Sequence, residues 1–298
     1  MTREEQKSMR NFSEFHKPST LAEASDLLMR KDPKTAVLSG GTWLIGEATR
    51  EIEAVVDIAG LGLDKITVLG NLIRIGAMVT LQSLVEDPLF GQHGSHAGLS
   101  LIGTAAHAAA ALSVRNSATI GGTLAIADCV SPLVTALLAC NAEVVIYGLR
   151  PINSSRDTDV FQVLPLSGFL SYGRSLLAQG ALITEIRVAR PSDDTRSAFE
   201  RIGRTPRDYP IVCVAAQYAI KAGIVGNMRL AVGGAGATPV RLTRFEFGVE
   251  KKYLNEFIDA ELTAATDLLT PTENFLGSAD YRRAMARVLA RRAVMSIA

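Results

Sequence analysis

The chain has 298 residues, with 31 Lys plus Arg against 30 Asp plus Glu, so its formal net charge is +1. This length allows about two domains and a sizeable buried core. The balanced charge argues against nucleic acid as the main partner, because binding a phosphate backbone normally needs a concentrated basic excess. No apolar run approaches the roughly twenty residues of a membrane span, and the charged start lacks the apolar segment of a signal peptide, so we expect a cytoplasmic protein.

Cysteine and histidine positions exclude several kinds of site. Cys129, Cys140 and Cys213 are widely spaced, so neither a disulfide framework nor a cysteine-ligated metal centre is indicated. His93 and His96 lie close together in a glycine-containing stretch that offers no further ligands. We therefore expect a surface loop there and no metal site.

The first half of the chain mixes short helices and strands. Thr20 or Ser19 followed by Glu23 is a capping-box pattern, and the apolar stripe after it predicts a helix. Strands are predicted at 35–38, 54–58, 72–77 and 143–147, with helical segments at 43–49, from residue 80, over 100–111 and over 133–140. The polar segment 150–159 predicts an exposed hairpin turn.

The second half places strands before helices. Strands are predicted at 182–188, 197–202, 211–220 and 227–232, and helices at 254–269 and 281–297, with a boundary between the halves near residue 180. This order indicates an α+β fold rather than a doubly wound sheet. The last helix carries a row of arginines, which we interpret as a solvated or partner-facing side: Arg282, Arg283, Arg287, Arg291 and Arg292.

Two diglycine segments organise the chain. Ser39-Gly40-Gly41-Thr42 and Thr119-Ile120-Gly121-Gly122-Thr123 each follow aliphatic or β-branched residues, which predicts a strand that enters a tight turn. Glycine pairs allow successive backbone N–H groups to converge on an anion, and the flanking hydroxyls donate to phosphate oxygens. Either segment alone is more typical of an ordinary turn, but together they predict a pyrophosphate site.

Better-known nucleotide motifs are missing. Neither segment fits G-x-G-x-x-G, and the chain has no Gly-Lys-Ser/Thr and no Gly-x-Ser-x-Gly. A Rossmann site, a P-loop and a hydrolase elbow therefore lack support, and a stand-alone NAD(P)-binding oxidoreductase lacks its motif.

The order of several segments resembles the FAD-binding medium subunit of molybdenum hydroxylases, the family of the carbon monoxide dehydrogenase medium subunit and the xanthine dehydrogenase FAD-binding subunit. The segments are Leu38-Ser39-Gly40-Gly41-Thr42, then Arg115-Asn116-Ser117-Ala118-Thr119-Ile120-Gly121-Gly122, then Glu200-Arg201 and Asp208-Tyr209. The resemblance spans nearly the whole chain, and Thr119-Ile120-Gly121-Gly122 is its most specific part.

This resemblance implies a two-subdomain FAD-binding fold of the vanillyl-alcohol-oxidase-like (PCMH) type, followed by an α+β domain with a three-stranded sheet and a helical bundle. The FAD-binding domain is expected at 10–180, with subdomains at about 10–60 and 61–180, and the C-terminal domain at 181–298. The resemblance also places the pyrophosphate on backbone amides of both glycine segments, at Ser39, Gly40, Gly41 and Thr42 and at Thr119, Gly121 and Gly122.

Departures from the family pattern bear on the same site. Trp43 stands where the family usually has Asp, Thr123 where it has Asn, and Cys129 and Pro132 replace its Pro and a hydroxyl-binding Asp. Asp128 and Ser131 are the nearest replacement acceptors. Loss of one charge-assisted acceptor would cost about 1.5–3 kcal/mol of binding free energy.

Several side chains leave two interpretations open. Trp43 either stacks on the flavin or adenine or fills part of the cleft, and Tyr209 either covers the flavin or packs at the start of a strand. Arg201 and Arg204 either stabilise reduced flavin by charge or face solvent or another subunit.

The activity implied by the resemblance is electron transfer. A partner large subunit would carry the molybdenum cofactor and oxidise substrate, a partner small subunit would carry two two-iron, two-sulfur clusters, and non-covalent FAD on this chain would pass electrons to NAD, a quinone or another acceptor. Covalent attachment is not expected, because Thr42 stands where covalently flavinylated relatives place a His. The alternative is a structural subunit of the same complex that has lost its flavin.

Overall fold

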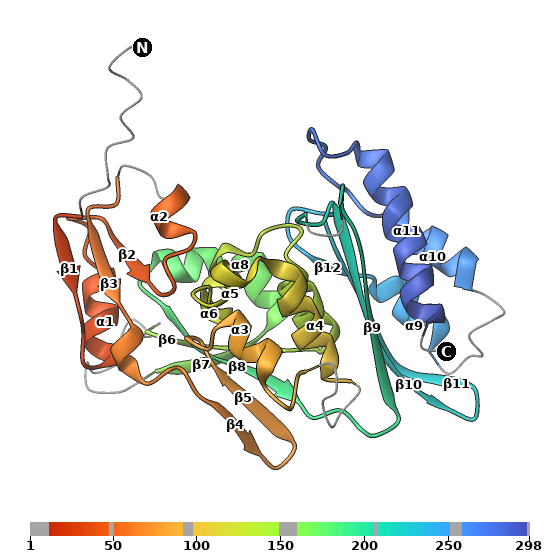
Figure 1. The fold of residues 1–298 in the computed structure, drawn as a ribbon, viewed down its shortest axis with the longest axis horizontal. Coiled ribbons are helices and arrows are strands. Elements are labelled where there is room, and N and C mark those ends of the chain that lie inside the picture. Colours follow the sequence, from red (N-terminus) through yellow and green to blue (C-terminus); the bar gives the residue numbers. More distant parts are fainter. Residues whose placement is uncertain are drawn as a thin grey trace.

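The computed structural model describes residues 12–47, 51–91, 98–148, 160–205, 208–250 and 258–296. These residues form three sheets that follow one another along the longest axis of the molecule (Figure 1). A three-stranded sheet lies at one end, a five-stranded sheet in the middle and a four-stranded sheet at the other end. The mixture of helices and sheets agrees with the predicted α+β class.

The N-terminal unit is a parallel sheet with strand order β1-β3-β2. Thr20 caps its main helix by accepting from the backbone N–H of Glu23, so the predicted helix start is confirmed. The Glu23 carboxylate accepts from the N–H of Ser19 at 2.8 Å, one residue before the cap, so the reciprocal bond of the capping box is shifted by one residue. The elements are β1 (Glu14–His16), α1 (Leu21–Leu28), β2 (Thr35–Leu38), α2 (Leu44–Glu47), β3 (Ala54–Asp57) and the 3₁₀ helix η1 (Ala59–Leu61).

The middle unit is an antiparallel sheet with order β4-β5-β8-β6-β7, and helices cover one of its faces (Figure 1). Its core lies between sheet and helices and includes Ile73, Ile75, Val144, Ile186 and Leu137. The strands are β4 (Ile66–Leu69), β5 (Leu72–Gly76), β6 (Glu143–Tyr147), β7 (Phe161–Pro165) and β8 (Leu182–Ala189). The helices are α3 (Leu81–Glu86), α4 (Ser100–Ala109), α5 (Leu112–Arg115), α6 (Ile120–Ile126), α7 (Pro132–Ala139) and α8 (Leu166–Ala178).

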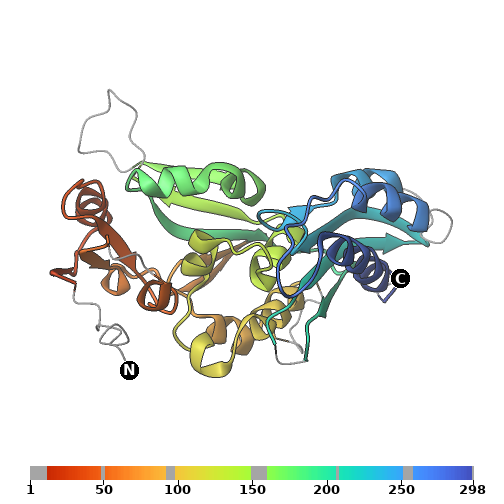
Figure 2. The same ribbon diagram turned by 90° about the horizontal axis from the view of Figure 1, so that it is seen from above.

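The C-terminal unit is an antiparallel sheet with order β12-β11-β10-β9, so the two-residue β12 extends the three expected strands. Three helices lie on one face of this sheet, and the other face of β10 meets α7 (Figures 1 and 2). Val214 belongs to the core under the helices, whereas Ala215 belongs to the core of the middle unit. The elements are β9 (Thr195–Ile202), β10 (Val212–Lys221), β11 (Ile224–Gly233), β12 (Val240–Arg241), α9 (Thr243–Val249), α10 (Ile258–Thr266) and α11 (Ala279–Met295).

Strand β8 bears on the domain division. The boundary expected at 180 falls before β8, yet β8 pairs with β5 and β6 in the sheet of the middle unit. We therefore propose that the two domains divide between β8 and β9. The subdomain division near residue 60 would fall within η1, between the first and second sheets.

The second diglycine segment differs from its prediction. Gly121 and Gly122 lie in the first turn of α6, which Thr119 caps, and only an isolated bridge from Thr119 to Thr80 has strand character. The prediction of a strand leading to a tight glycine turn is therefore wrong here. A Thr followed by apolar and small residues equally describes a helix start.

The arginine row on α11 is also only partly as predicted. Arg282 is buried and donates to the carbonyl of Ile211 at 2.6 Å and to Oδ1 of Asn274 at 2.8 Å, so its assignment to a solvated or partner-facing side is wrong. Arg287 and Arg291 form surface ion pairs with Asp267 and Asp259. These three arginines of α11 thus bind residues of their own domain.

Some predictions fall outside the described residues, namely the hairpin turn at 150–159 and the loop with His93 and His96. No helix in the described part of the chain has the length and apolarity needed to cross a membrane. Nor do the described residues gather three or more His, Cys, Asp or Glu side chains in a metal-binding arrangement.

Candidate functional site

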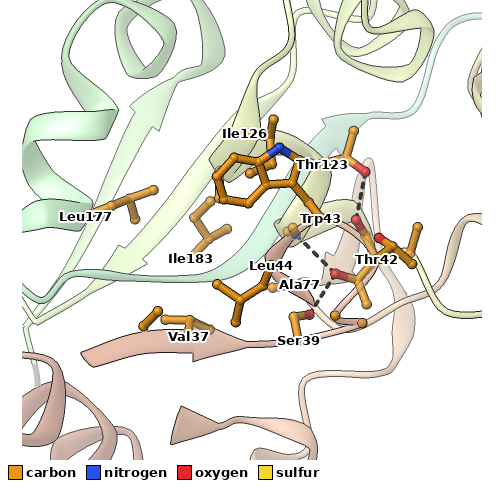
Figure 3. Close-up of a pocket in the computed structure, with 18 of the residues that line it drawn as sticks. Val37, Ser39, Thr42, Trp43, Leu44, Ala77, Thr123, Ile126, Leu177 and Ile183 are labelled. Atoms are coloured by element: carbon orange, nitrogen blue, oxygen red, sulfur yellow. Dashed lines mark hydrogen bonds between the residues drawn. The ribbon is translucent and has the colours of Figure 1, made fainter. Parts of the chain in front are cut away.

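A cleft of about 690 Å³ lies between the N-terminal sheet and the helices of the middle unit. Its size is within the usual range of small-molecule sites. Figure 3 shows part of its lining, with side chains that come from the first glycine loop, from α6, from α8 and from β8. All twelve residues predicted for the cofactor site line this cleft: Ser39, Gly40, Gly41, Thr42, Trp43, Thr119, Gly121, Gly122, Thr123, Asp128, Ser131 and Tyr209.

The first glycine loop leaves β2 and offers free backbone donors. Gly41 has a φ of +69°, which glycine adopts without steric cost, and the chain then enters the short α2. Within the described part of the chain, no group accepts from the backbone N–H groups of Gly40, Gly41, Thr42 or Trp43. Four successive free N–H groups in a loop that lines a cleft are the arrangement that binds an anion.

Close contact with the segment before α6 holds this loop in place. A Cβ at Gly40 would lie 1.7 Å from the carbonyl oxygen of Ser117, so only glycine permits the approach. The Ser39 hydroxyl lies 2.7 Å from the Thr119 hydroxyl, and a hydrogen bond joins the two segments across 80 residues of sequence (Figure 3). The two glycine segments therefore face one cleft, as predicted.

The start of α6 uses its backbone donors differently. The N–H of Gly121 donates to the carbonyl of Ala77 at 2.9 Å, and the N–H of Gly122 donates to the hydroxyl of Thr119 at 3.1 Å. A Cβ at Gly121 would lie 2.8 Å from Ala77, so this glycine permits close packing of α6. Amide contacts from Thr119, Gly121 and Gly122 to a pyrophosphate stay a prediction. The hydrogen bond from the N–H of Gly122 to the rotatable Thr119 hydroxyl is the one most readily replaced by a bond to a phosphate oxygen.

Polar side chains collect at the end of the cleft next to the C-terminal unit. Asp128 is exposed, and its Oδ1 accepts from the N–H of Val130 at 2.8 Å and from the Tyr209 hydroxyl at 3.4 Å. Partial burial, together with the negative charge of Asp128, raises the pKa of the Tyr209 hydroxyl, so this group is a neutral donor. Ser131 is buried and caps α7, and its hydroxyl accepts weakly from Val134 at 3.4 Å.

Apolar side chains line a further part of the cleft. Figure 3 shows Val37, Leu44, Leu177 and Ile183 there, with the Trp43 indole projecting into the space between Ile126 and Ile183. Most of these positions were not predicted, because Leu177 on α8 and Ile183 on β8 lie far from both glycine segments in sequence. Their apolar character is typical of any core position, so no local signal marked them.

The remaining departures from the expected pattern lie beside the cleft. Pro132 is buried as the first residue of α7 and does not line the cleft, so it leaves the space open. Cys129 is half-buried, and burial together with the Asp128 charge raises the pKa of its thiol. Arg201 donates to the backbone carbonyls of Ala108 and Asp208, whereas Arg204 is exposed, and neither lines the cleft.

Comparison with known proteins assigns the family. Residues 9–191 match the family described as the FAD binding domain in molybdopterin dehydrogenase, and residues 197–297 match the CO dehydrogenase flavoprotein C-terminal domain. The chain belongs to this family. It is an FAD-binding medium subunit of the molybdenum hydroxylase type, and its fold is the two-subdomain FAD-binding fold with an α+β C-terminal domain that the resemblance implied.

Individual relatives cover almost the whole chain. The nicotine 6-hydroxylase medium subunit of Paenarthrobacter nicotinovorans is 27% identical over 94% of this chain and 95% of the relative. The nicotinate dehydrogenase FAD-subunit of Eubacterium barkeri is 30% identical over 80% of this chain and 79% of the relative. Among solved structures, the chain matches carbon monoxide dehydrogenase from Hydrogenophaga pseudoflava, in a form that lacks the Mo-pyranopterin moiety of the molybdenum cofactor. The TM-score is 0.84 and the sequence identity is 28%, over 96% of this chain and 97% of that chain.

The cleft fits FAD on its own chemistry. The first glycine loop offers free N–H groups for a pyrophosphate, the polar end offers a carboxylate and hydroxyls for sugar or ribityl hydroxyl groups, and the apolar part offers a surface for a ring. All three environments lie in a single cleft.

Proposed function

We propose that this chain is the FAD-binding electron-transfer subunit of a multi-subunit molybdenum hydroxylase. The observation that carries the proposal is the first glycine loop, whose free N–H groups at Gly40, Gly41, Thr42 and Trp43 line a cleft in an FAD-binding family member. FAD would be held non-covalently, since Thr42 supplies a hydroxyl and no imidazole at the position of covalent attachment.

The rest of the complex would lie on partner chains. A large subunit would carry the molybdenum cofactor and oxidise the substrate, and a small subunit would carry two two-iron, two-sulfur clusters. Cys140 and Cys213 are buried, and burial raises the pKa of each thiol to about 12, which favours neutral side chains that do not ligate iron. This supports clusters on another chain.

Bound FAD supplies the chemistry of accepting electrons from iron–sulfur clusters and releasing them to NAD, a quinone or another acceptor. The residues of this chain hold and orient the cofactor. The free amides of the first loop would hold the pyrophosphate, and the Asp128 carboxylate would accept from hydroxyl groups of the cofactor at the polar end. The neutral Tyr209 hydroxyl adds a donor there without adding charge.

A flavin-free structural subunit is the second candidate. Its specific support is that the N–H groups of Gly121 and Gly122 already donate within the protein and that Thr123 and Pro132 depart from the family pattern. The first loop favours the redox subunit instead, because its N–H groups at Gly40, Gly41, Thr42 and Trp43 have no acceptor among the described residues and belong to residues that line the cleft.

The visible absorption spectrum of the purified chain, followed by assay of the flavin released on denaturation, separates the two candidates. The redox proposal expects about one FAD per chain in the supernatant after denaturation, with none left attached to the polypeptide. Colourless protein that also takes up no added FAD would leave the structural subunit as the conclusion.

A further inference from the structure

Trp43 exposes part of a large apolar side chain at the cleft. Its side chain is 46% exposed, whereas the next residue, Leu44, is buried at 8%. The backbone is held by the turn that follows, since the carbonyl of Trp43 accepts from the N–H of Gly46 at 3.1 Å. The indole is thus anchored at its base, while its ring projects into the cleft (Figure 3).

Apolar side chains lie on two sides of the indole ring. Ile126 and Ile183 lie on either side of the ring in Figure 3, and Leu177 continues the same apolar lining. This part of the cleft offers a surface for stacking, and its apolar side chains offer no hydrogen bonds. Asp128, which follows Ile126 by two residues, and the Tyr209 hydroxyl 3.4 Å from it add polar groups to the lining on the side of the C-terminal unit.

The two ring systems of FAD differ in what they require. The isoalloxazine carries a pyrimidine-like edge with several donors and acceptors, which suits the polar end of the cleft. Adenine binds largely through its faces, because every base presents a π-surface to an aromatic side chain. A pyrophosphate held by the first glycine loop would lie beside Trp43, so one ring system of FAD would come within reach of the indole, and the apolar side chains there suit adenine.

We infer that Trp43 stacks on the adenine ring of FAD and covers that end of the cleft. The inference rests on the proposed function and adds to it the side chain that recognises the nucleotide half of the cofactor. Ile126 and Ile183 would confine the opposite face and edge of the same ring. FMN, which lacks adenine, would gain nothing from Trp43.

The experiment uses the full chain freed of flavin, with FAD, FMN and ADP as probes. Trp43 is the only tryptophan of the chain, so the intrinsic indole emission reports on this position alone. ADP contains no flavin and does not quench by energy transfer, so a saturable change of emission on ADP addition would report direct contact. Affinities for FAD and FMN are then measured for Trp43→Ala and Trp43→Phe by the quenching of flavin fluorescence.

Trp43→Ala is expected to weaken FAD and ADP about 5- to 150-fold, the range of one lost base–aromatic stack. It should change FMN affinity less than about twofold, and Trp43→Phe should recover most of the FAD affinity. Tyr172→Ala is the matched control, because Tyr172 is an aromatic side chain with 45% exposure on α8 that does not line the cleft. This control should bind all three probes like the parent chain.

Two results would overturn the inference while leaving the proposed function intact. Either Trp43→Ala binds FAD as tightly as the parent chain, or it loses FMN and FAD affinity by the same factor, which would place the isoalloxazine against the indole. A parent chain that binds no FAD at all would overturn the proposed function and this inference together.

Discussion

The contact between Gly40 and Ser117 gives the sharpest test of the cleft's construction. In Gly40→Ala the added Cβ would lie 1.7 Å from the Ser117 carbonyl oxygen and 2.6 Å from its carbonyl carbon. Both atoms belong to the backbone, so the two segments must move apart. The separation would also break the 2.7 Å hydrogen bond between the Ser39 and Thr119 hydroxyls.

The expected magnitude follows from these two losses. Overpacking typically costs about 1–3 kcal/mol, and a lost hydrogen bond about 1 kcal/mol, so we expect Gly40→Ala to lower the free energy of unfolding by roughly 2–4 kcal/mol. In a thermal scan this corresponds to a midpoint lower by roughly 4–16 °C. FAD affinity should fall at least about tenfold, because the free N–H groups move with the loop.

Gly46→Ala is the matched control for this substitution. A Cβ at Gly46 meets no atom within 4 Å, and the residue lies in α2, where alanine is favoured over glycine by up to about 1 kcal/mol. The control should therefore keep or slightly raise the midpoint and keep FAD affinity. If Gly40→Ala behaved like Gly46→Ala in both assays, the close approach of the two segments would not be part of the site.

Two further predictions follow from charges and protonation. Asp128→Asn keeps a side-chain oxygen for the N–H of Val130 but removes the negative charge. FAD titration should therefore give roughly 10- to 150-fold weaker binding, and ultraviolet titration should give a lower pKa for the Tyr209 hydroxyl. Unchanged affinity and pKa would mean that Asp128 is not part of the site. Burial raises the pKa of the Cys140 and Cys213 thiols from 9.0 to about 12. The folded state therefore holds these protons more tightly than the unfolded state, so the free energy of unfolding must fall as the pH rises from 9 to 12. Between pH 8 and pH 10 each thiol should lower the free energy of unfolding, measured in urea titrations, by about 1 kcal/mol. Cys140→Ala should remove one thiol's share of this loss, and an equal loss in that variant would mean that the thiol does not ionise on unfolding.

Local signals in the sequence were sufficient for much of the fold. The Thr20 and Thr80 caps and the strand β6 lie where they were predicted, because a cap or a short apolar strand is defined by neighbours in sequence. The two glycine segments also marked the cleft correctly, since glycine is required wherever two backbones approach closely.

Features set by distant contacts could not be predicted in the same way. Gly121 and Gly122 have the composition of a turn, and only the packing of α6 against Ala77 makes them part of a helix. Arg282 is buried because Ile211 and Asn274 accept its hydrogen bonds, and nothing in the helix sequence distinguishes it from Arg283. The apolar lining from Leu177 and Ile183 depends likewise on how α8 and β8 are placed.

The central claim is that the first glycine loop binds FAD in this cleft, and FAD titration of the parent chain against Gly41→Val tests it most directly. Gly41 has a φ of +69°, and a side chain there would also lie 3.1 Å from Ile45, so valine must distort the loop that carries the free N–H groups. We predict one FAD per parent chain and at least a tenfold loss of affinity in Gly41→Val, with the fold retained by circular dichroism. Equal FAD binding by the two proteins would contradict the account and place the cofactor elsewhere on the chain.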